Sequence, residues 1–228
     1  MAKHLQRELE NLKKELLLIA SMVENATRKA LTALVERRRE LAEEVIDEDY
    51  LINEKEVKIE EECLKILALY QPVAIDLRFV ITALKVNNDL ERVGDLAVNI
   101  AERAIFLSSR EMLALTLDFP GMADKAQSML AASLDSLTHN DAKLARQVIT
   151  MDDAVDLANH NMIKALRQQM QQNPTTIKRA THLISASSQL ERIADLATNI
   201  AEDVIYMVEG EVVRHQTEDF IKKEEEEE

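Results

Sequence analysis

Glycine, proline and aromatic residues are scarce in this sequence. Its 228 residues include 3 glycines, 3 prolines, 3 tyrosines, 4 phenylalanines and no tryptophan. Sandwiches and barrels of β-strands need many turn residues and many aromatic or β-branched side chains, so this composition excludes them. With 46% hydrophobic and 31% charged residues, the chain is instead expected to be an all-α protein of long helices.

Cysteine and long apolar runs are scarce as well. Cys63 is the single cysteine, which excludes an intramolecular disulfide and any CxxC metal or redox motif. Glu8, Glu10 and Glu15 come before any apolar stretch that could act as a signal peptide, which argues against one. No apolar run approaches the roughly 18 residues of a membrane-spanning helix. These absences predict a soluble, cytoplasmic protein.

The charge is strongly negative. There are 42 Asp and Glu against 28 Lys and Arg, which gives a formal net charge of -14. Such a molecule repels the phosphates of nucleic acids and anionic lipid headgroups, so we expect no nucleic-acid partner and membrane contact only through other proteins. Five glutamates, 224–228, end the chain, and we expect residues 216–228 to be an acidic, disordered tail.

The few turn residues divide the chain into helical segments. They are Pro72, Pro120, Pro174 and Gly210. Each proline is expected to open a helix, most clearly at Asn173-Pro174, because Asn is a favoured N-cap and Pro is tolerated in the first turn. Gly210 is expected to close the last helix. Further breaks are expected at 36–40 and 138–141, which gives six helices with the fourth shorter than the others.

An internal repeat organises these helices. The stretch 90–102 recurs at 190–202, 100 positions later, and a weaker match relates 49–53 to 152–156, 103 positions later. Self-similarity over such a period indicates duplication of one structural unit. We therefore predict two tandem, duplicated three-helix bundles, which cover residues 1–114 and 115–215.

Polar residues of the repeated segment share one helix face. At the helical period they fall within an arc of about 80°, opposite the apolar residues. The stripes are Glu91, Asp95, Asn99 and Glu102 in the first copy, and Glu191, Asp195, Asn199 and Glu202 in the second. The preceding helices carry partner stripes that include Asp49 and Asn53 in the first copy, and Asp152 and Asp156 in the second.

These stripes predict bound cations. Carboxylates at i and i+4 repel each other by a few tenths of a kcal/mol per pair unless a positive charge compensates. Two neighbouring antiparallel helices of this kind would offer about six to eight oxygen ligands, which suit hard or borderline metal ions. A solvated charged face is the alternative interpretation. The sequence has no Glu-x-x-His motif, which argues against the di-iron chemistry of ferritin-like bundles.

From about residue 5 to residue 215, the chain resembles the PhoU family of phosphate-transport regulatory proteins. The motifs that carry this resemblance are Glu91-Arg-Val-Gly-Asp95, Glu191-Arg-Ile-Ala-Asp195, Gln71-Pro-Val-Ala-Ile-Asp-Leu-Arg78 and Tyr206-Met-Val-Glu-Gly210. The resemblance implies a homodimeric, non-enzymatic protein at the cytoplasmic side of the membrane. It also implies negative regulation of phosphate uptake and the phosphate-starvation response, through the ATPase subunit of a phosphate ABC transporter and a phosphate-sensing histidine kinase.

The resemblance also implies metal sites, because some family members bind multinuclear metal clusters on such motifs. Iron, zinc, manganese, nickel and magnesium are the candidate ions. The ligands would be Glu91 and Asp95 in one bundle and Glu191 and Asp195 in the other, with the Asp residues of the preceding helices facing them. Asn53 departs from the pattern, since an Asp would be the stronger ligand there. The alternatives are a carboxylate-bridged di-metal hydrolase or oxidase, and a metal-free helical adaptor.

Overall fold

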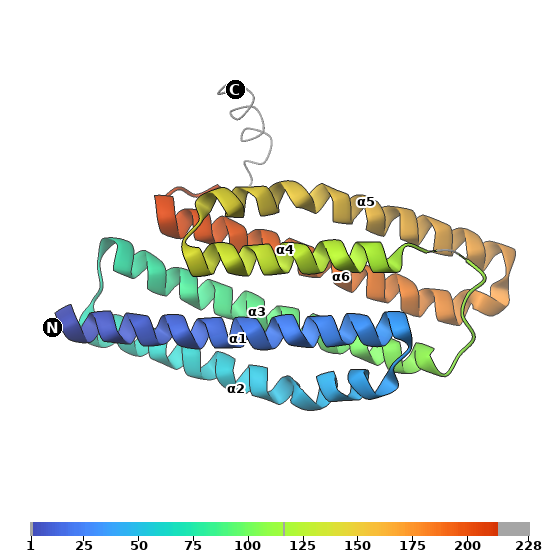
Figure 1. Ribbon diagram of the computed structural model, residues 1–228, viewed down its shortest axis with the longest axis horizontal. Helices are drawn as coiled ribbons and strands as arrows, with labels where there is room; N and C mark the ends of the chain where they lie inside the picture. Colours follow the sequence, from blue (N-terminus) through green and yellow to red (C-terminus); the bar gives the residue numbers. More distant parts are fainter. Residues whose placement is uncertain (1, 116, 214–228) are drawn as a thin grey trace, which may run out of the picture.

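The computed structural model describes residues 2–115 and 117–213, and within these ranges all regular structure is helical (Figure 1). The elements are α1 (Ala2–Glu36), α2 (Arg39–Tyr70), α3 (Ala74–Ser108), α4 (Phe119–His139), α5 (Ala142–Gln172), a 3₁₀ turn η1 (Pro174–Thr176) and α6 (Ile177–Glu209). The predicted all-α class with six long helices is confirmed, and α4, with 21 residues, is the shortest of them. The predicted tail, 216–228, lies outside the described residues.

Left-handed residues close four of the helices, and Gln71 does so for α2 with φ of 48°. Arg37 at the α1–α2 turn has φ of 60°, and Asn140 at the α4–α5 turn has φ of 54°. Asp141 then caps α5, accepting a hydrogen bond from the backbone nitrogen of Leu144 at 3.0 Å. Gly210 ends α6 with φ of 80°, a conformation that glycine adopts without strain. These positions confirm the predicted breaks.

The prolines behave less uniformly than predicted. Pro120 is the second residue of α4, and Pro174 opens the short turn η1 just before α6. Pro72 does not open α3, which begins at Ala74 after an extended Val73. Ala74 has a left-handed φ of 51°, so the chain changes direction there before the right-handed helix begins.

The helices form two bundles that lie side by side. In Figure 1, α1–α3 occupy the lower half and α4–α6 the upper half, with all six roughly parallel or antiparallel to the long axis. Leu12, Leu16 and Ile19 show how each helix buries one face, because their spacing of four and three residues places them on the same side and all are at most 1% exposed. The buried side chains of both bundles form one continuous core.

The two bundles meet along α3 and α6, which run antiparallel. Lys85 Nζ lies 3.0 Å from Asp203 Oδ1, and Arg103 Nε donates to Ser185 Oγ at 3.2 Å. In the 100-residue repeat, Lys85 corresponds to Ser185 and Arg103 corresponds to Asp203. The two contacts therefore join the same two equivalent positions, with the repeats exchanged. The positions of the contacts at this junction therefore have pseudo-twofold symmetry, but the charges of the residues at these positions do not.

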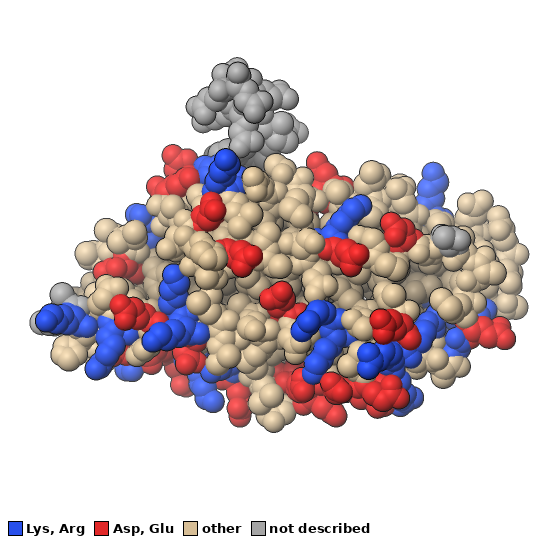
Figure 2. All heavy atoms as spheres, viewed as in Figure 1, with Lys and Arg blue, Asp and Glu red and all other residues tan. Residues whose placement is uncertain are grey.

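The surface is highly charged. Figure 2 shows acidic side chains gathered along the lower edge, where α2 runs, with basic side chains interspersed. Among the described residues, none of the helices combines the length and the apolar composition that crossing a membrane requires.

Candidate metal centre

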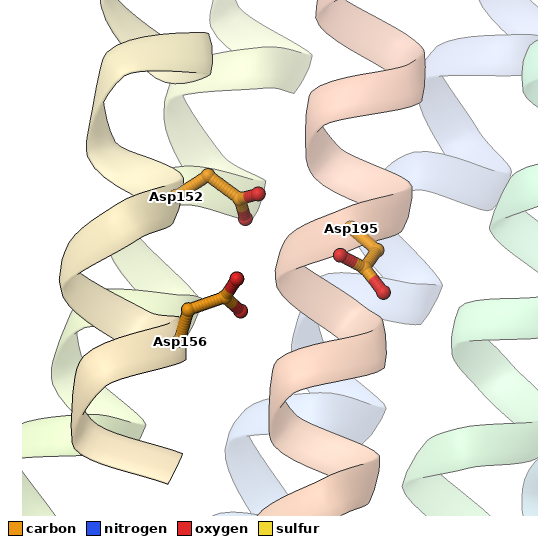
Figure 3. A group of neighbouring side chains, drawn as sticks. All are labelled: Asp152, Asp156 and Asp195. Carbon is orange, nitrogen blue, oxygen red and sulfur yellow. The ribbon is translucent and has the colours of Figure 1, made fainter. Parts of the chain in front are cut away.

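The second repeat brings three aspartates together between α5 and α6. One carboxylate oxygen from each of Asp152, Asp156 and Asp195 lies within 4.8 Å of those of the other two (Figure 3). Asp152 and Asp156 are one turn apart on α5, and Asp195 faces them from α6. Asp152 is half-buried, whereas Asp156 and Asp195 are exposed. All three were predicted ligands, and their contact forms a compact all-oxygen cluster.

The electrostatics of this cluster are unfavourable without a cation. The pKa of Asp152 is raised to about 6, first by burial and then by the charges of Asp156 and Asp195. Burial and the neighbouring carboxylates also raise the pKa of Glu191 and of Asp195. One oxygen of Asp152, Oδ1, is buried and has no hydrogen-bond partner. An unpartnered buried carboxylate oxygen beside two further carboxylates fits a hard oxygen-binding cation.

The first repeat has a weaker version of the same arrangement. Asp49 corresponds to Asp152, but Asn53 stands where the second repeat has Asp156. Asn53 Nδ2 donates to Asp49 Oδ2 at 3.0 Å, while Asp49 Oδ1 is buried without a hydrogen-bond partner. Burial raises the pKa of Asp49, and the nearby charge of Asp95 adds to the effect. The amide group of Asn53 therefore occupies one carboxylate oxygen of Asp49. In the second repeat the carboxylate of Asp156 stands at this place, and it leaves the equivalent oxygen of Asp152 open to a metal.

Glu91 belongs to the first-repeat cluster. Its pKa is raised by burial and by the charges of Asp95, Glu56 and Asp49. Four carboxylates from α2 and α3 therefore lie near one another, and they are those of Asp49, Glu56, Glu91 and Asp95. However, among the described residues only the second repeat brings three possible metal ligands of the Asp, Glu, His or Cys type within 4.8 Å of one another.

The remaining four predicted ligands lie along the stripes beyond these clusters. Asn99 Nδ2 donates to the carbonyl of Asp95 in its own helix at 2.9 Å, and Glu102 pairs with Arg103 at 3.1 Å. Asn199 and Glu202 line an open groove of about 740 Å³ between the two repeats, together with Glu56. The structure thus divides the twelve predicted ligands into two carboxylate clusters and a set of flanking polar residues. Their role as metal ligands stays a prediction.

The stripes do lie opposite the core, as predicted. The apolar positions of the first copy are all buried, and they are Val93, Leu96, Ala97, Ile100 and Ala104. Glu91 is half-buried and Asp95 is exposed. The helical period alone was sufficient for this result.

Sequence reasoning missed a pair of polar bridges that hold the stripe helices together. Asn87 on α3 donates to the backbone carbonyl of Glu56 on α2 at 2.9 Å. At the equivalent place, Ser187 on α6 donates to Asn159 Oδ1 on α5 at 2.7 Å. Both donors are buried, with Asn87 1% exposed and Ser187 fully covered. Their 100-residue spacing within apolar stretches was the signal that could have revealed them.

Comparison with known proteins adds an independent line of argument. The model of the PhoU domain matches residues 16–104 and again residues 119–204, once in each repeat. A phosphate-specific transport system accessory protein PhoU homolog of Aquifex aeolicus is 43% identical over 210 residues, which cover 92% of this chain and 95% of the relative. A homolog from Pseudomonas putida is 40% identical over 209 residues, which cover 91% of this chain and 82% of the relative.

Solved structures show the same fold. The crystal structure of PhoU from Pseudomonas aeruginosa has a TM-score of 0.88 at 38% identity, and the match covers 90% of this chain and 99% of that one. The phosphate transport system regulatory protein PhoU from Streptococcus pneumoniae has a TM-score of 0.84 at 32% identity, covering 92% and 99%. Sequence and structure agree over nearly the whole chain, and the chain belongs to the PhoU family.

Proposed function

We propose that this protein is a negative regulator of phosphate uptake and of the phosphate-starvation response. The observation that carries the proposal is the family match in both repeats, because the relatives are named as accessory or regulatory proteins of phosphate transport. In this proposal the protein acts in the cytoplasm as a homodimer, by binding and without catalysis. It connects the ATPase subunit of the phosphate ABC transporter to a phosphate-sensing histidine kinase.

The proposal includes metal ions on the two carboxylate clusters. Asp152, Asp156, Asp195 and Glu191 would hold metal in the second repeat, and the cluster around Asp49 would bind more weakly in the first. Iron, zinc, manganese, nickel and magnesium all accept carboxylate oxygens, singly or in bridged clusters. A bound cation would neutralise the mutual repulsion of these carboxylates and tie α5 to α6. Asp152 would be the least solvated ligand, because its Oδ1 is already buried.

The second candidate is a di-metal hydrolase or oxidase that uses the same three aspartates. Their close approach favours it, because bridged metal pairs activate water in many enzymes. Against it stands the exposure of Asp156 and Asp195, since a reacting substrate needs an enclosed site that excludes water. Turnover of phosphoesters by metal-loaded protein, lost on Asp195→Ala, would favour the enzyme over the regulator.

The regulatory role predicts a clear phenotype. Deletion of the gene is expected to leave phosphate-repressible phosphatase activity high in phosphate-rich medium, because the kinase is no longer held quiet. The measurement is phosphatase activity in the deletion strain, the parent strain and a complemented strain. Normal repression in the deletion strain would contradict the proposed function.

The metal proposal predicts a difference between the repeats. Elemental analysis of protein purified without chelator is expected to show metal in the unmodified chain and a large loss in Glu191→Ala/Asp195→Ala. The matched variant Glu91→Ala/Asp95→Ala is expected to lose less, because Asn53 stands in place of Asp156 there and the described carboxylates of that cluster form no group of three within 4.8 Å. Identical, substoichiometric metal in all three proteins would remove the metal from the proposal and leave the regulator as a metal-free adaptor.

A further inference from the structure

Four cations gather at one end of this acidic molecule. They come from the α1–α2 turn, the segment just after α3 and the first turn of α6, which lie together at the right of Figure 1. We call this surface the basic end, and it consists of Arg37, Arg110, Lys178 and Arg179. Among the described residues, none of these four side chains forms an ion pair with a carboxylate.

Specific contacts hold the basic end in place. Arg37 donates to the backbone carbonyls of Leu107 and Arg110. Arg179 Nη1 donates to the carbonyl of Glu111 at 2.9 Å. Burial lowers the pKa of Arg37, and the positive charge of the nearby Arg179 lowers it further. Each arginine guanidinium group carries five N–H donors, and the backbone carbonyls accept hydrogen bonds from only some of them.

An aromatic pair supports the other two cations. The guanidinium carbon of Arg110 lies 3.8 Å from the centre of the Phe106 ring, and Lys178 Nζ lies 5.4 Å from it. Phe106 also stacks on His182 with ring centres 3.6 Å apart. Burial and the nearby cations lower the pKa of His182, which keeps this ring neutral and adds no charge to the cluster. The cations are thus anchored on a rigid platform.

Helix capping accounts for only part of this cluster. Arg37 and Arg110 lie at the carboxyl end of α3, where positive charge is favourable. Lys178 and Arg179 lie in the first turn of α6, where the helix dipole disfavours positive charge and acidic residues are absent. Arg37 also adopts a left-handed φ of 60°, which asparagine or glycine tolerates better. The charges of Lys178 and Arg179 and the backbone conformation of Arg37 are therefore unfavourable for the isolated protein, which points to a ligand outside it.

The repeat supplies an internal comparison. At the opposite end of the molecule, Asn140 takes the place of Arg37 with a φ of 54°, and Gly210 takes the place of Arg110. Phe79 corresponds to Arg179, and only Lys178 has a basic counterpart, Arg78. The same fold can thus be built at this position with one cation instead of four. The extra charge is specific to one end.

Exposed apolar side chains accompany the cations. Met112 is 71% exposed and follows α3, while Ile177 is 48% exposed and begins α6. Arginine and methionine are enriched in protein interfaces, and guanidinium forks match carboxylates in paired hydrogen bonds. We propose that the basic end is a docking surface for an acidic segment of a partner protein, with apolar side chains of that segment on Met112 and Ile177.

A protein partner fits these observations better than an anionic membrane. Three of the four cations are arginines, whose planar forks favour defined carboxylate pairs over diffuse attraction. A bilayer surface would also meet the rest of the molecule, whose net charge of -14 repels anionic headgroups. A protein segment can contact the basic end alone. Within the part of the chain that the structure describes, none of the four cations contacts a carboxylate cluster.

A binding assay with the full chain tests this inference. The probe is a fluorescein-labelled peptide of four Glu-Glu-Leu units, and the readout is fluorescence anisotropy. The unmodified protein is expected to bind it more tightly than the matching Gln-Gln-Leu peptide, and added salt should weaken the complex. Arg110→Ala/Arg179→Ala is expected to weaken binding by about tenfold or more, because two charge-assisted contacts are lost.

Two controls separate binding from folding. Arg78→Ala, at the equivalent place in the other end, is expected to leave peptide affinity unchanged. Arg179→Phe introduces the residue that the other repeat already carries, so it should fold normally, as checked by thermal melting, and still weaken the complex. Unchanged peptide affinity in both Arg110→Ala/Arg179→Ala and Arg179→Phe would overturn the inference. A loss of affinity in Arg78→Ala as large as theirs would overturn it too. Variant-sensitive binding to phosphatidylglycerol vesicles without peptide binding would assign the surface to membranes and overturn it as well.

Discussion

Replacing Lys85 by methionine is expected to lower the free energy of unfolding by about 2–3 kcal/mol. Asp203 is 1% exposed, and its Oδ1 lies 3.0 Å from the ammonium group of Lys85 across the α3–α6 junction. Removal of Lys85 takes away a cation that compensates for the lost hydration of this buried carboxylate. The expected cost lies at the lower end of the range for buried pairs, because the Lys85 side chain is itself 39% exposed and partly screened.

Urea denaturation followed by circular dichroism measures this change. Arg39→Met is the matched control, because its ion pair with Glu43 lies on the exposed surface of α2 and should contribute little. The double variant Lys85→Met/Asp203→Leu is expected to recover much of the loss, since Ile81, Tyr206 and Val213 line the space around Asp203. A Lys85→Met protein as stable as the original would show that the pair does not hold the repeats together.

Replacing Asp152 by asparagine is expected to stabilise the metal-free protein at pH 7 by about 1–2 kcal/mol. The folded protein binds the Asp152 proton more tightly than the unfolded chain does, because the pKa is raised from 3.8 to about 6. The stability gained from this proton is complete below pH 4 and is lost as the pH rises through about 6. Full conversion of the shift would give about 3 kcal/mol, which solvent screening of this half-buried group reduces.

Thermal melts in EDTA at pH 4 and pH 7 test this prediction. The variant should melt higher than the original at pH 7 and at the same temperature at pH 4. Asp47→Asn, on the exposed face of α2, serves as the control and should change neither. Excess Mn²⁺ at pH 7 is expected to stabilise the original chain more than Asp152→Asn. Equal melting temperatures in EDTA at both pH values would mean that Asp152 is not electrostatically strained.

Most of the fold could be predicted from the sequence because its signals are local. Turn residues such as Gly210 and the 138–141 segment mark helix ends through their own backbone preferences. The 100-residue repeat identified the two copies without any knowledge of their packing. The predicted start of α3 at Pro72 was wrong, because α3 begins later, at Ala74. The left-handed conformation of Ala74 cannot be predicted from its being an alanine.

The candidate site was only partly predictable. Helical periodicity shows which residues share a face, so Asp152 and Asp156 were correctly placed on one side of α5. Periodicity does not give distances between helices, and the approach of Asp195 depends on how α5 and α6 pack. It also does not show that the amide nitrogen of Asn99 donates to its own helix, which leaves Oδ1 as the atom for the predicted metal contact. The basic end combines residues more than 140 positions apart, which no local pattern relates.

The charges at the α3–α6 junction also decide which repeats pack against each other. If α3 of one molecule packed on α3 of a second molecule in the same geometry, Lys85 would face Arg103 of that molecule, and the like charges would repel. In an α6–α6 pair, Asp203 would face Ser185 in place of Lys85. The present pairing joins Lys85 with Asp203 within one chain. The different charges of the two repeats thus favour α3–α6 pairing over pairing between like repeats.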